Sequence, residues 1–266
     1  MDPRVELFVD SGAFTAWTKG AVVDVDAYGT FLRAHASKIT VAANLDVIPG
    51  RPGKLPSALD IDKAAAQGWE NYATLQKKLR GTDVSLLHAY HRGEPVRWLK
   101  KLVDECEYFG LGGLAGRGTT TDKKMSFLDE VMPHLTDDAG RPIRKFHGFG
   151  VTSAELVRRY PWYSVDSTTW SNMGRYGWLL LGIDGGRHYA VLDETQELKP
   201  HIRSCSDAER DAVRRYIGKW GYRLEDVVCD IKLIHELNIL YFLDLERELT
   251  ERAPAWRRAA APRSFF

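Results

Sequence analysis

The sequence predicts an α/β protein, and within that class a (β/α)8 barrel of the TIM type. Short apolar segments alternate with amphipathic helical patterns, and polar residues follow almost every apolar segment. Parallel strands covered by helices on both faces have such apolar sequences. A doubly wound sheet also fits this alternation, but the glycine-rich phosphate turn that marks many of them does not follow the first strand. Polar residues at many strand ends favour the closed barrel.

Six segments are predicted strands because each is a short apolar run bounded by polar or glycine residues. They are Val5–Val9, Ile39–Leu45, Val84–Ala89, Tyr108–Leu111, Phe146–Gly150 and Tyr163–Val165. A helical pattern separates most of them, and a row of βα units predicts a parallel sheet.

The helices are predicted from apolar residues that recur every three or four positions. Such stripes begin at Tyr28, Trp69 and Trp98. Side chains that suit a helix N-cap precede or open several of these patterns. The predicted single caps are Asp24, Asp60 and Thr121, and the predicted capping boxes pair Thr152 with Glu155 and Ser206 with Glu209.

The pattern changes after Trp170. Trp178–Ile183 and His188–Leu192 flank a turn sequence and predict a β-hairpin inserted after the barrel strands. Added C-terminal helices are predicted over Ser206–Trp220 and from Leu224 to about Thr250. Residues 1–251 are assigned to a single barrel domain, and the basic residues 252–266, with two prolines, to a disordered tail.

Composition limits the functional classes. The 266 residues include three widely spaced cysteines, which predicts neither a disulfide framework nor a metal motif. The sequence has no apolar run near the ~20 residues of a membrane span and no secretory signal pattern, so we expect a cytoplasmic protein without a membrane partner. The net charge is +1, so the chain has no strong excess of basic residues, although basic residues cluster over 210–223. Such clusters are mostly solvated helix faces.

The run from Asp10 to Phe14 is the strongest functional signal. It places a carboxylate, the Ser11 hydroxyl, Gly12 and an aromatic ring directly after the first strand. Gly12 would let a ligand approach the backbone, and Phe14 would stack on a flat heterocycle. The ordinary alternatives are a turn role for Asp10 and core packing for Phe14.

A second carboxylate, Asp166, has the same setting after the sixth strand. Hydroxyls flank it at Ser164, Ser167, Thr168 and Thr169, and hydrogen bonds from such groups favour the ionised carboxylate. An ionised aspartate beside a sugar suits nucleophilic attack on its anomeric carbon. Two carboxylates around one sugar suit cleavage of a glycosidic bond.

Other strand ends carry candidate ligand contacts. Asn44 and Asp46 follow the second strand, and His88, Tyr90 and His91 end the third. A metal at His88 and His91 is the alternative there. An alternating strand would place these two rings on opposite faces, and no further ligand cluster completes such a site.

Two glycine-rich segments also end strands. They are Gly110–Gly116, which contains Gly112, Gly113 and Leu114, and His147–Gly150. Their exposed backbone groups would hydrogen-bond the edge of a planar ligand. Phosphate binding competes with that reading, but the Lys-Ser or Lys-Thr of a P-loop is absent.

The order of these motifs resembles that of tRNA-guanine transglycosylases. The likeness is closer to their DNA-acting, DpdA-like relatives in phages and bacteria, the 7-deazaguanine transglycosylases. It covers roughly residues 5–180 and includes the runs Asp10–Phe14, Leu45-Asp46, Gly112–Ala115, His147–Gly150 and Val165–Ser167.

The resemblance implies a (β/α)8 barrel that cleaves the N-glycosidic bond of a flipped-out base, modified or guanine-type. Asp166 matches the nucleophile, Asp10 the acid/base and Phe14 the stacking ring. Asp46, Gly113 and Leu114 match contacts to the base edge. His88 or Tyr90 replaces a glutamine that the family often carries. The remaining predicted substrate-binding residues are Ser11, Gly12, Asn44, Gly112, His147 and Ser167.

The cysteine-and-histidine zinc module of the tRNA enzymes has no counterpart here. We therefore expect no cofactor and no metal, and DNA rather than tRNA as the partner, in a bacterial or phage-infected cell. A free 7-deazaguanine-type base would be the second substrate of an exchange reaction. Three alternatives stay open: a DNA glycosylase that excises modified bases without exchange, as in defence against phage; a non-catalytic nucleic-acid-binding subunit; and a metal-dependent hydrolase using His88 and His91.

Overall fold

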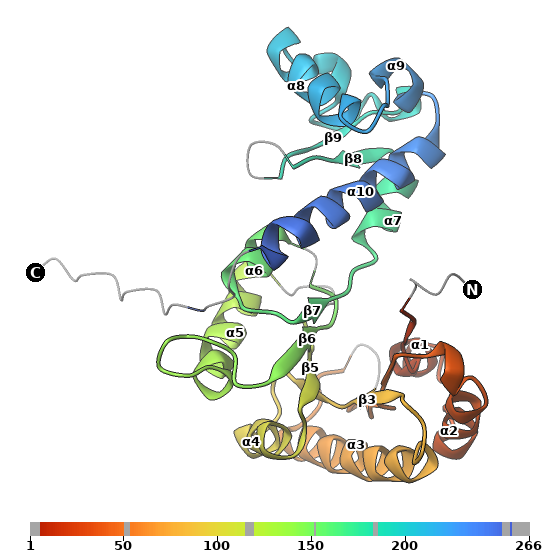
Figure 1. Ribbon diagram of the computed structural model, residues 1–266, viewed down its shortest axis with the longest axis vertical. Helices are drawn as coiled ribbons and strands as arrows, with labels where there is room; N and C mark the ends of the chain where they lie inside the picture. The colour runs from red at the N-terminus through yellow and green to blue at the C-terminus, as the bar shows by residue number, and fades with distance from the viewer. Residues whose placement is uncertain are drawn as a thin grey trace, which may run out of the picture. The chain divides into compact units, whose positions relative to one another are not determined.

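The computed structural model describes residues 6–50, 54–114, 120–151, 153–182, 186–251 and 256 (Figure 1). The chain divides into two compact units. The first contains the described residues up to Phe149 together with Trp162–Ser164, and the second contains Gly150–Pro161 and the described residues from Val165 onward.

The strands that the sequence predicts form two sheets. One has the order β1-β2-β3, formed by Phe8–Val9, Val41–Ala43 and Ser85–Leu87, and both of its strand pairs are parallel. The other has the order β4-β5-β6-β7, formed by Ala89–His91, Tyr108–Gly112, Lys145–Gly148 and Ser164–Val165. Its pairs β4–β5 and β5–β6 are parallel. The α/β class with parallel sheets is therefore confirmed.

The third predicted strand is interrupted at His88, between β3 and β4. The carbonyl of Leu87 accepts from the Asn44 N–H at 2.7 Å, and the carbonyl of His88 accepts from the Gly110 N–H at 2.8 Å. Two successive carbonyls thus bond to opposite neighbours. Residue 88 is where hydrogen bonding passes from one sheet to the other.

Five α-helices belong to the described part of the first unit: α1 (Ala13–Thr18), α2 (Val25–Ala34), α3 (Ala58–Lys78), α4 (Val96–Glu105) and α5 (Thr121–Leu135). A 3-10 turn, Ala36–Lys38, leads into β2. Large apolar side chains from the helices and strands are fully buried, among them Leu32, Leu75, Leu99, Leu102, Phe109, Leu111, Leu128 and Phe146. Each such side chain contributes about 1.5–3 kcal/mol.

The N-caps are partly as predicted. Asp24 caps α2 by accepting from the Ala27 N–H at 2.7 Å. The prediction of Asp60 as a cap is wrong, because Ser57 caps α3 and Asp60 is its reciprocal partner in a capping box. The cap of α5 is Thr120 rather than Thr121. In both cases a second capping residue stands one to three positions before the predicted one.

The second unit contains α6 (Ala154–Arg159), α7 (Thr169–Arg175), the strands β8 (Trp178–Leu180) and β9 (His188–Ala190), 3-10 turns at Asp193–Thr195 and Ile202–Ser204, and the helices α8 (Asp207–Gly218), α9 (Leu224–Val227) and α10 (Ile231–Thr250). β8 and β9 pair antiparallel, with Leu179 opposite Tyr189. The predicted hairpin is confirmed, although residues 183–185 of its turn lie outside the described part.

The capping box of Ser206 and Glu209 at the start of α8 is confirmed. Ser153 caps α6, and Thr152, the residue predicted for that role, lies outside the described residues.

The prediction of one helix from Leu224 to about Thr250 is wrong. α9 ends at Val227, and α10 begins at Ile231. The carboxylate of Asp230 accepts from the Lys232 N–H at 2.8 Å and so caps a new helix. Aspartate favours this local bond over a place inside a helix, whereas the apolar stripe that continues across the break carries no sign of it.

Asn238 connects three segments of the second unit. Its amide donates to the carbonyls of Trp170 at 3.2 Å and Trp178 at 3.0 Å, and its Oδ1 accepts from the Leu180 N–H at 2.8 Å. The side chain is completely buried on α10. It thereby attaches α10 to the start of α7 and to β8.

A closed barrel and a single domain over residues 1–251 stay predictions. Apart from Trp256, the tail assigned to residues 252–266 lies outside the described part of the chain. None of the helices among the described residues has both the length and the apolar character that crossing a bilayer requires.

Candidate functional site

The segment after β1 presents its side chains to solvent. Asp10 is exposed, and Phe14, in the first turn of α1, is 64% exposed. Gly12 stands at the helix start with φ of +71°, a backbone conformation that favours glycine. The Ser11 hydroxyl accepts from the Ala13 N–H at 3.4 Å. Core packing is therefore the wrong reading of Phe14, whose ring is available to a ligand.

A hydrogen bond from Trp17 holds the helix that carries Phe14. The Trp17 indole donates to the carbonyl of Gly50 at 3.2 Å, which attaches α1 to the segment after β2. The rings of Phe14 and Trp17 lie 6.1 Å apart. The exposed ring thus stands on an anchored helix.

Two predicted carboxylates influence the same buried tyrosine. Tyr28, on α2, donates from its hydroxyl to the carbonyl of Ala43 at 2.9 Å. Burial raises the pKa of this phenol, and the negative charges of Asp10 and then Asp46 raise it further. Asp10 and Asp46 follow the carboxyl ends of the neighbouring parallel strands β1 and β2.

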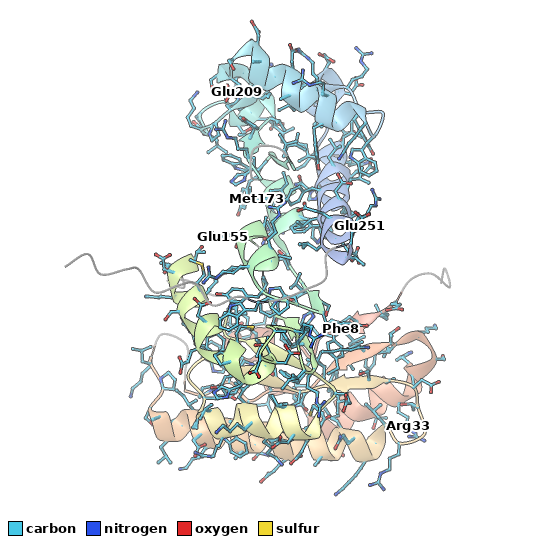
Figure 2. All side chains as sticks on the ribbon, turned by 60° about the vertical axis from the view of Figure 1, so that its left-hand side comes forward. Phe8, Arg33, Glu155, Met173, Glu209 and Glu251 are labelled. Carbon is cyan, nitrogen blue, oxygen red and sulfur yellow. The ribbon has the colours of Figure 1, made fainter. Side chains whose placement is uncertain are left out.

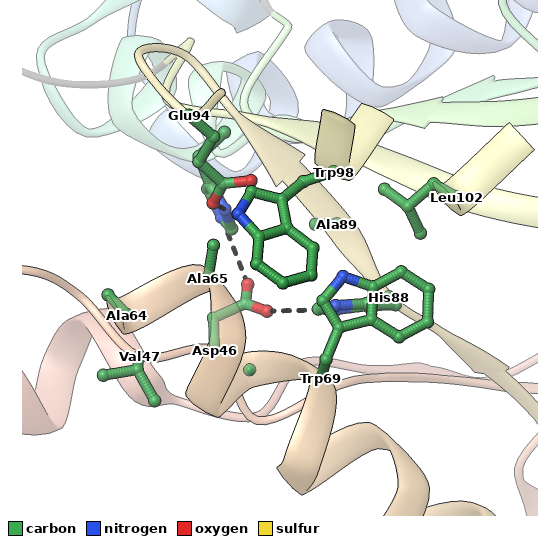
Figure 3. A pocket seen from close by; sticks show the side chains of 12 residues that line it. Asp46, Val47, Ala64, Ala65, Trp69, His88, Ala89, Glu94, Trp98 and Leu102 are labelled. Atoms are coloured by element: carbon green, nitrogen blue, oxygen red, sulfur yellow. Dashed lines mark hydrogen bonds and ion pairs between the residues drawn. The ribbon is translucent and has the colours of Figure 1, made fainter. Parts of the chain in front are cut away.

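Asp46 is engaged by a histidine that is itself held by a second acid (Figure 3). His91 Nε2 lies 3.2 Å from Asp46 Oδ2, and His91 Nδ1 lies 3.0 Å from Glu94 Oε1. Burial disfavours the charged imidazole, but the charge of Asp46 and hydrogen bonds to Asp46 and Glu94 raise the pKa of His91 to about 10. His91 is a cation between two carboxylates at neutral pH.

His88 has the opposite character. Its buried ring is stacked on Tyr72 and meets Trp69 edge-on, with centroid distances of 5.2 and 4.5 Å. The Asn44 amide donates to the Gly68 carbonyl at 2.9 Å and lies 3.0 Å from His88 Nδ1. Because that amide nitrogen is a donor, His88 Nδ1 accepts and carries no proton. Burial lowers the pKa of His88 to about 4 despite the charge of Asp46.

The interruption at His88 changes how these rings are placed. An uninterrupted strand would put His88 and His91 on opposite faces. Instead both face one carboxylate, since His88 Nδ1 lies 4.0 Å from Asp46 Oδ1 on the side away from His91. The expectation of opposite faces is wrong because alternation is broken between β3 and β4.

The pocket beside Asp46 is small. Figure 3 shows Trp69, His88, Trp98 and Leu102 closing around it, and its volume is about 10 Å³. That volume holds about one water molecule. A nucleobase therefore does not fit between Asp46 and His88 with these side chains in place.

A titration experiment tests the cation assigned to His91. Its folded-state pKa is raised above the usual 6.5, so its stabilising contribution is complete below that pH and is lost as the pH rises through about 10. We expect His91→Gln to lower the free energy of unfolding by about 1–3 kcal/mol near pH 6, with partial exposure reducing the effect. The difference from wild type should shrink toward pH 10 in urea unfolding.

His35→Gln, at an exposed position of the same unit, is the control. A difference between His91→Gln and wild type that stays constant over this pH range would contradict the assignment of a cation to His91.

Other predicted contacts lie in the interior. Tyr90 stacks on Phe127 at 6.1 Å and donates to the carbonyl of Glu94 at 2.7 Å. Leu114 is completely buried. His147 is buried beside Phe8, and its Nδ1 lies 2.8 Å from the Ser164 hydroxyl. In this arrangement these side chains pack or support the strands, and Tyr90 and Leu114 present no surface to a ligand.

The glycines of β5 make room for neighbouring side chains. A Cβ on Gly112 would lie 2.3 Å from His91 Cδ2, so only glycine allows the imidazole to cross the strand there. Gly113 has φ of +72°. Residues 115 and 116 of the same run lie outside the described part. The absence of a side chain at Gly112 is therefore a condition for the contact between His91 and Asp46.

Asp166 belongs to the second unit and is exposed. Its Oδ1 accepts from the backbone N–H of Gly150 at 2.7 Å. The hydroxyl of Ser167 accepts from the Thr169 N–H at 2.9 Å, and that of Ser164 joins Tyr108 at 2.6 Å. The Gly150 N–H therefore helps to hold the Asp166 carboxylate.

Sequence reasoning did not assign Glu94 or Tyr28 to the site. The spacing of His91 and Glu94, three residues apart across a turn, was the available sign for Glu94. Nothing in the sequence marked Tyr28 as more than one residue of a helix stripe. Asn44, Asp46 and His88 lie together, since the Asn44 amide is 3.0 Å from His88 Nδ1 and that nitrogen is 4.0 Å from Asp46 Oδ1.

The described residues contain no group of three or more histidine, cysteine, aspartate or glutamate side chains arranged to hold a metal ion. In particular, His88 and His91 face Asp46 rather than a shared empty centre.

No protein-family model matches the chain, and no curated protein matches its sequence.

Proposed function

We propose that this protein cleaves the N-glycosidic bond of a base in nucleic acid, most simply DNA. The observation that supports this best is the pairing of an exposed carboxylate with an exposed aromatic ring after β1. Asp10 and Phe14 stand four residues apart, with Gly12 in the turn between them. A carboxylate beside a stacking surface suits proton transfer to a flat heterocycle.

The ring of Phe14 supplies the binding step. Stacking of a base on an aromatic side chain contributes about 1–3 kcal/mol and does not depend on base identity. Extruding a base from a duplex costs a few kcal/mol, least for a damaged or unpaired base. Stacking on Phe14 offsets part of that cost. It also avoids the pocket beside Asp46, which is too small for a base.

Asp10 supplies the proton step. When the bond between the anomeric carbon and the base nitrogen breaks, the base leaves with the bonding electron pair. Asp10 donates a proton to that base, or later removes one from an incoming base. General acid catalysis of this kind contributes roughly 10²–10⁴-fold to a rate.

Asp166 is the residue predicted from the sequence for the anomeric carbon. Its carboxylate oxygen would form the new bond to that carbon as the base leaves. The Gly150 N–H on its other oxygen supports the ionised form that a nucleophile needs. Attack by a second base on the resulting intermediate gives exchange, and attack by water gives an abasic site.

A product analysis tests the proposal. Wild-type protein is incubated with modified and unmodified DNA, single- and double-stranded, in the presence of labelled 7-cyano-7-deazaguanine. Mass spectrometry of the released bases and of the DNA is the readout. Release of the original base together with label in the DNA means exchange. Release of the base that leaves abasic sites, with no label in the DNA, means excision. DNA that stays intact across all of these substrates contradicts the proposed activity.

A further inference from the structure

A basic pocket lies where α2 and α3 end. The two helices pack against each other. Beside them lies an open pocket of about 440 Å³. Its lining consists of Gly29, Thr30, Arg33, Lys77, Lys78 and Arg80. Four of these six side chains are cationic and none is acidic. Figure 2 shows Arg33 at the margin of the first unit.

Arg33 is fixed at the pocket by the main chain. Its Nη1 donates to the carbonyl of Lys78 at 2.6 Å and to that of Arg80 at 3.0 Å. Carbonyls at a helix end are partly negative and would repel an anion. The guanidinium covers them, and its planar group of donors is held in position before any ligand arrives.

Most of the positive charge in this pocket lacks an internal counter-charge. Lys78 pairs with Asp26 at 2.9 Å. Across the described ranges of the chain, no carboxylate forms an ion pair with Arg33, Lys77 or Arg80.

The basic cluster noted in the sequence behaves differently. In the second unit Arg210 pairs with Asp207, Arg214 with Asp211 and Glu225, Lys219 with Asp244, and Arg223 with Glu225. Those cations are largely neutralised by neighbours. The pocket at the ends of α2 and α3, which the sequence did not reveal, keeps its charge.

Gly29 helps to shape the pocket. A Cβ at this position would lie 2.6 Å from Lys78 Cδ. The missing side chain lets Lys78 lie across α2.

The pocket is separate from the candidate site. The last turns of α2 and α3 lead into the amino ends of β2 and β3, whereas Asp10 and Asp46 follow the carboxyl ends of β1 and β2. In a parallel sheet the amino and carboxyl ends of the strands lie on opposite sides of the sheet. A ligand bound at the pocket therefore does not occupy the base-binding position proposed above.

We propose that this pocket binds phosphate groups. A guanidinium held in place beside flexible lysine ammonium groups suits the charge and the oxygen geometry of phosphate. Two sources share that chemistry: a small free phosphoanion and the backbone of a nucleic acid. The proposal stands independently of the glycosidic activity.

The test compares two double variants of the full-length protein. Lys77→Gln with Arg80→Gln removes two charges at the pocket, and Arg214→Gln with Arg223→Gln removes two charges from the paired cluster. Binding of inorganic pyrophosphate is measured by calorimetry, and binding of a labelled oligonucleotide by fluorescence anisotropy over a salt series. Neither assay requires base release, so failure of the proposed activity leaves this test intact.

We expect the pocket variant to weaken binding about tenfold, and the control variant to bind within about twofold of wild type. If the ligand is a backbone, the slope of log affinity against log salt should fall by about two in the pocket variant. If it is a small phosphoanion, the tenfold loss in the pocket variant should appear with pyrophosphate, and the oligonucleotide should not compete for that site. Equal binding by both variants, or no binding of either probe to wild type, overturns the proposal.

Discussion

Replacing Asp10 with asparagine is expected to slow base release about 10²–10⁴-fold, the contribution of a general acid or base. The amide keeps the shape of the side chain but cannot give up or take a proton near neutral pH. Asp10 is exposed and precedes the turn at Gly12, so the fold should be unaffected. The measurement is the single-turnover rate of base release from DNA.

Asp104→Asn is a matched control, because it removes one exposed carboxylate from α4 in the same unit. It should release base at the wild-type rate. Asp166→Asn should abolish release while leaving DNA binding in place. An Asp10→Asn protein as active as the control would show that Asp10 carries no proton in the reaction, and an active Asp166→Asn protein would remove the nucleophile assignment.

The largest effect on stability is expected from Asn238→Leu in the second unit. Asn238 is completely buried and makes three hydrogen bonds, to the carbonyls of Trp170 and Trp178 and from the Leu180 N–H. A leucine of similar size leaves all three backbone groups without this partner. Each unpaired buried group costs about 1–3 kcal/mol, so the free energy of unfolding should fall by about 3–5 kcal/mol.

Urea unfolding followed by circular dichroism measures this loss. Asn172→Leu is the control, because Asn172 is exposed on α7 and bonds only the Thr168 hydroxyl among the contacts described for its side chain. That variant should change the midpoint little. A loss below about 1 kcal/mol in Asn238→Leu would mean that water or a shift of α10 replaces the bonds.

The strands could be predicted because their signal is local. Val41–Ala43 and Tyr108–Gly112 fall within or next to apolar runs bounded by polar residues. The helix ends were harder, because capping depends on which of several nearby polar side chains bonds the free N–H groups. Ser57 takes that role ahead of Asp60, and Asp230 divides a continuous apolar stripe. The spacing of apolar residues does not determine which polar side chain becomes the cap.

The candidate site was predictable in its strand-end residues but not in their partners. Asp10 and Asp46 each follow an apolar run, which predicts a position at the carboxyl end of a parallel strand. The contact of His91 with Asp46 depends on the register of β4 with β5 and on the space above Gly112. Both are tertiary properties. The burial of Tyr90 against Phe127 likewise depends on a helix that packs on the strand from elsewhere in the chain.

The length of the segment between β3 and β4 determines which side chains of β4 face the candidate site. Tyr90 turns toward α5 and His91 toward Asp46, and one residue, His88, sets which of them faces which side. Deleting or inserting a single residue there would exchange the two faces of the following strand. Homologous chains should therefore tolerate length changes at the exposed turn residues 138 and 139 but not between Leu87 and His91.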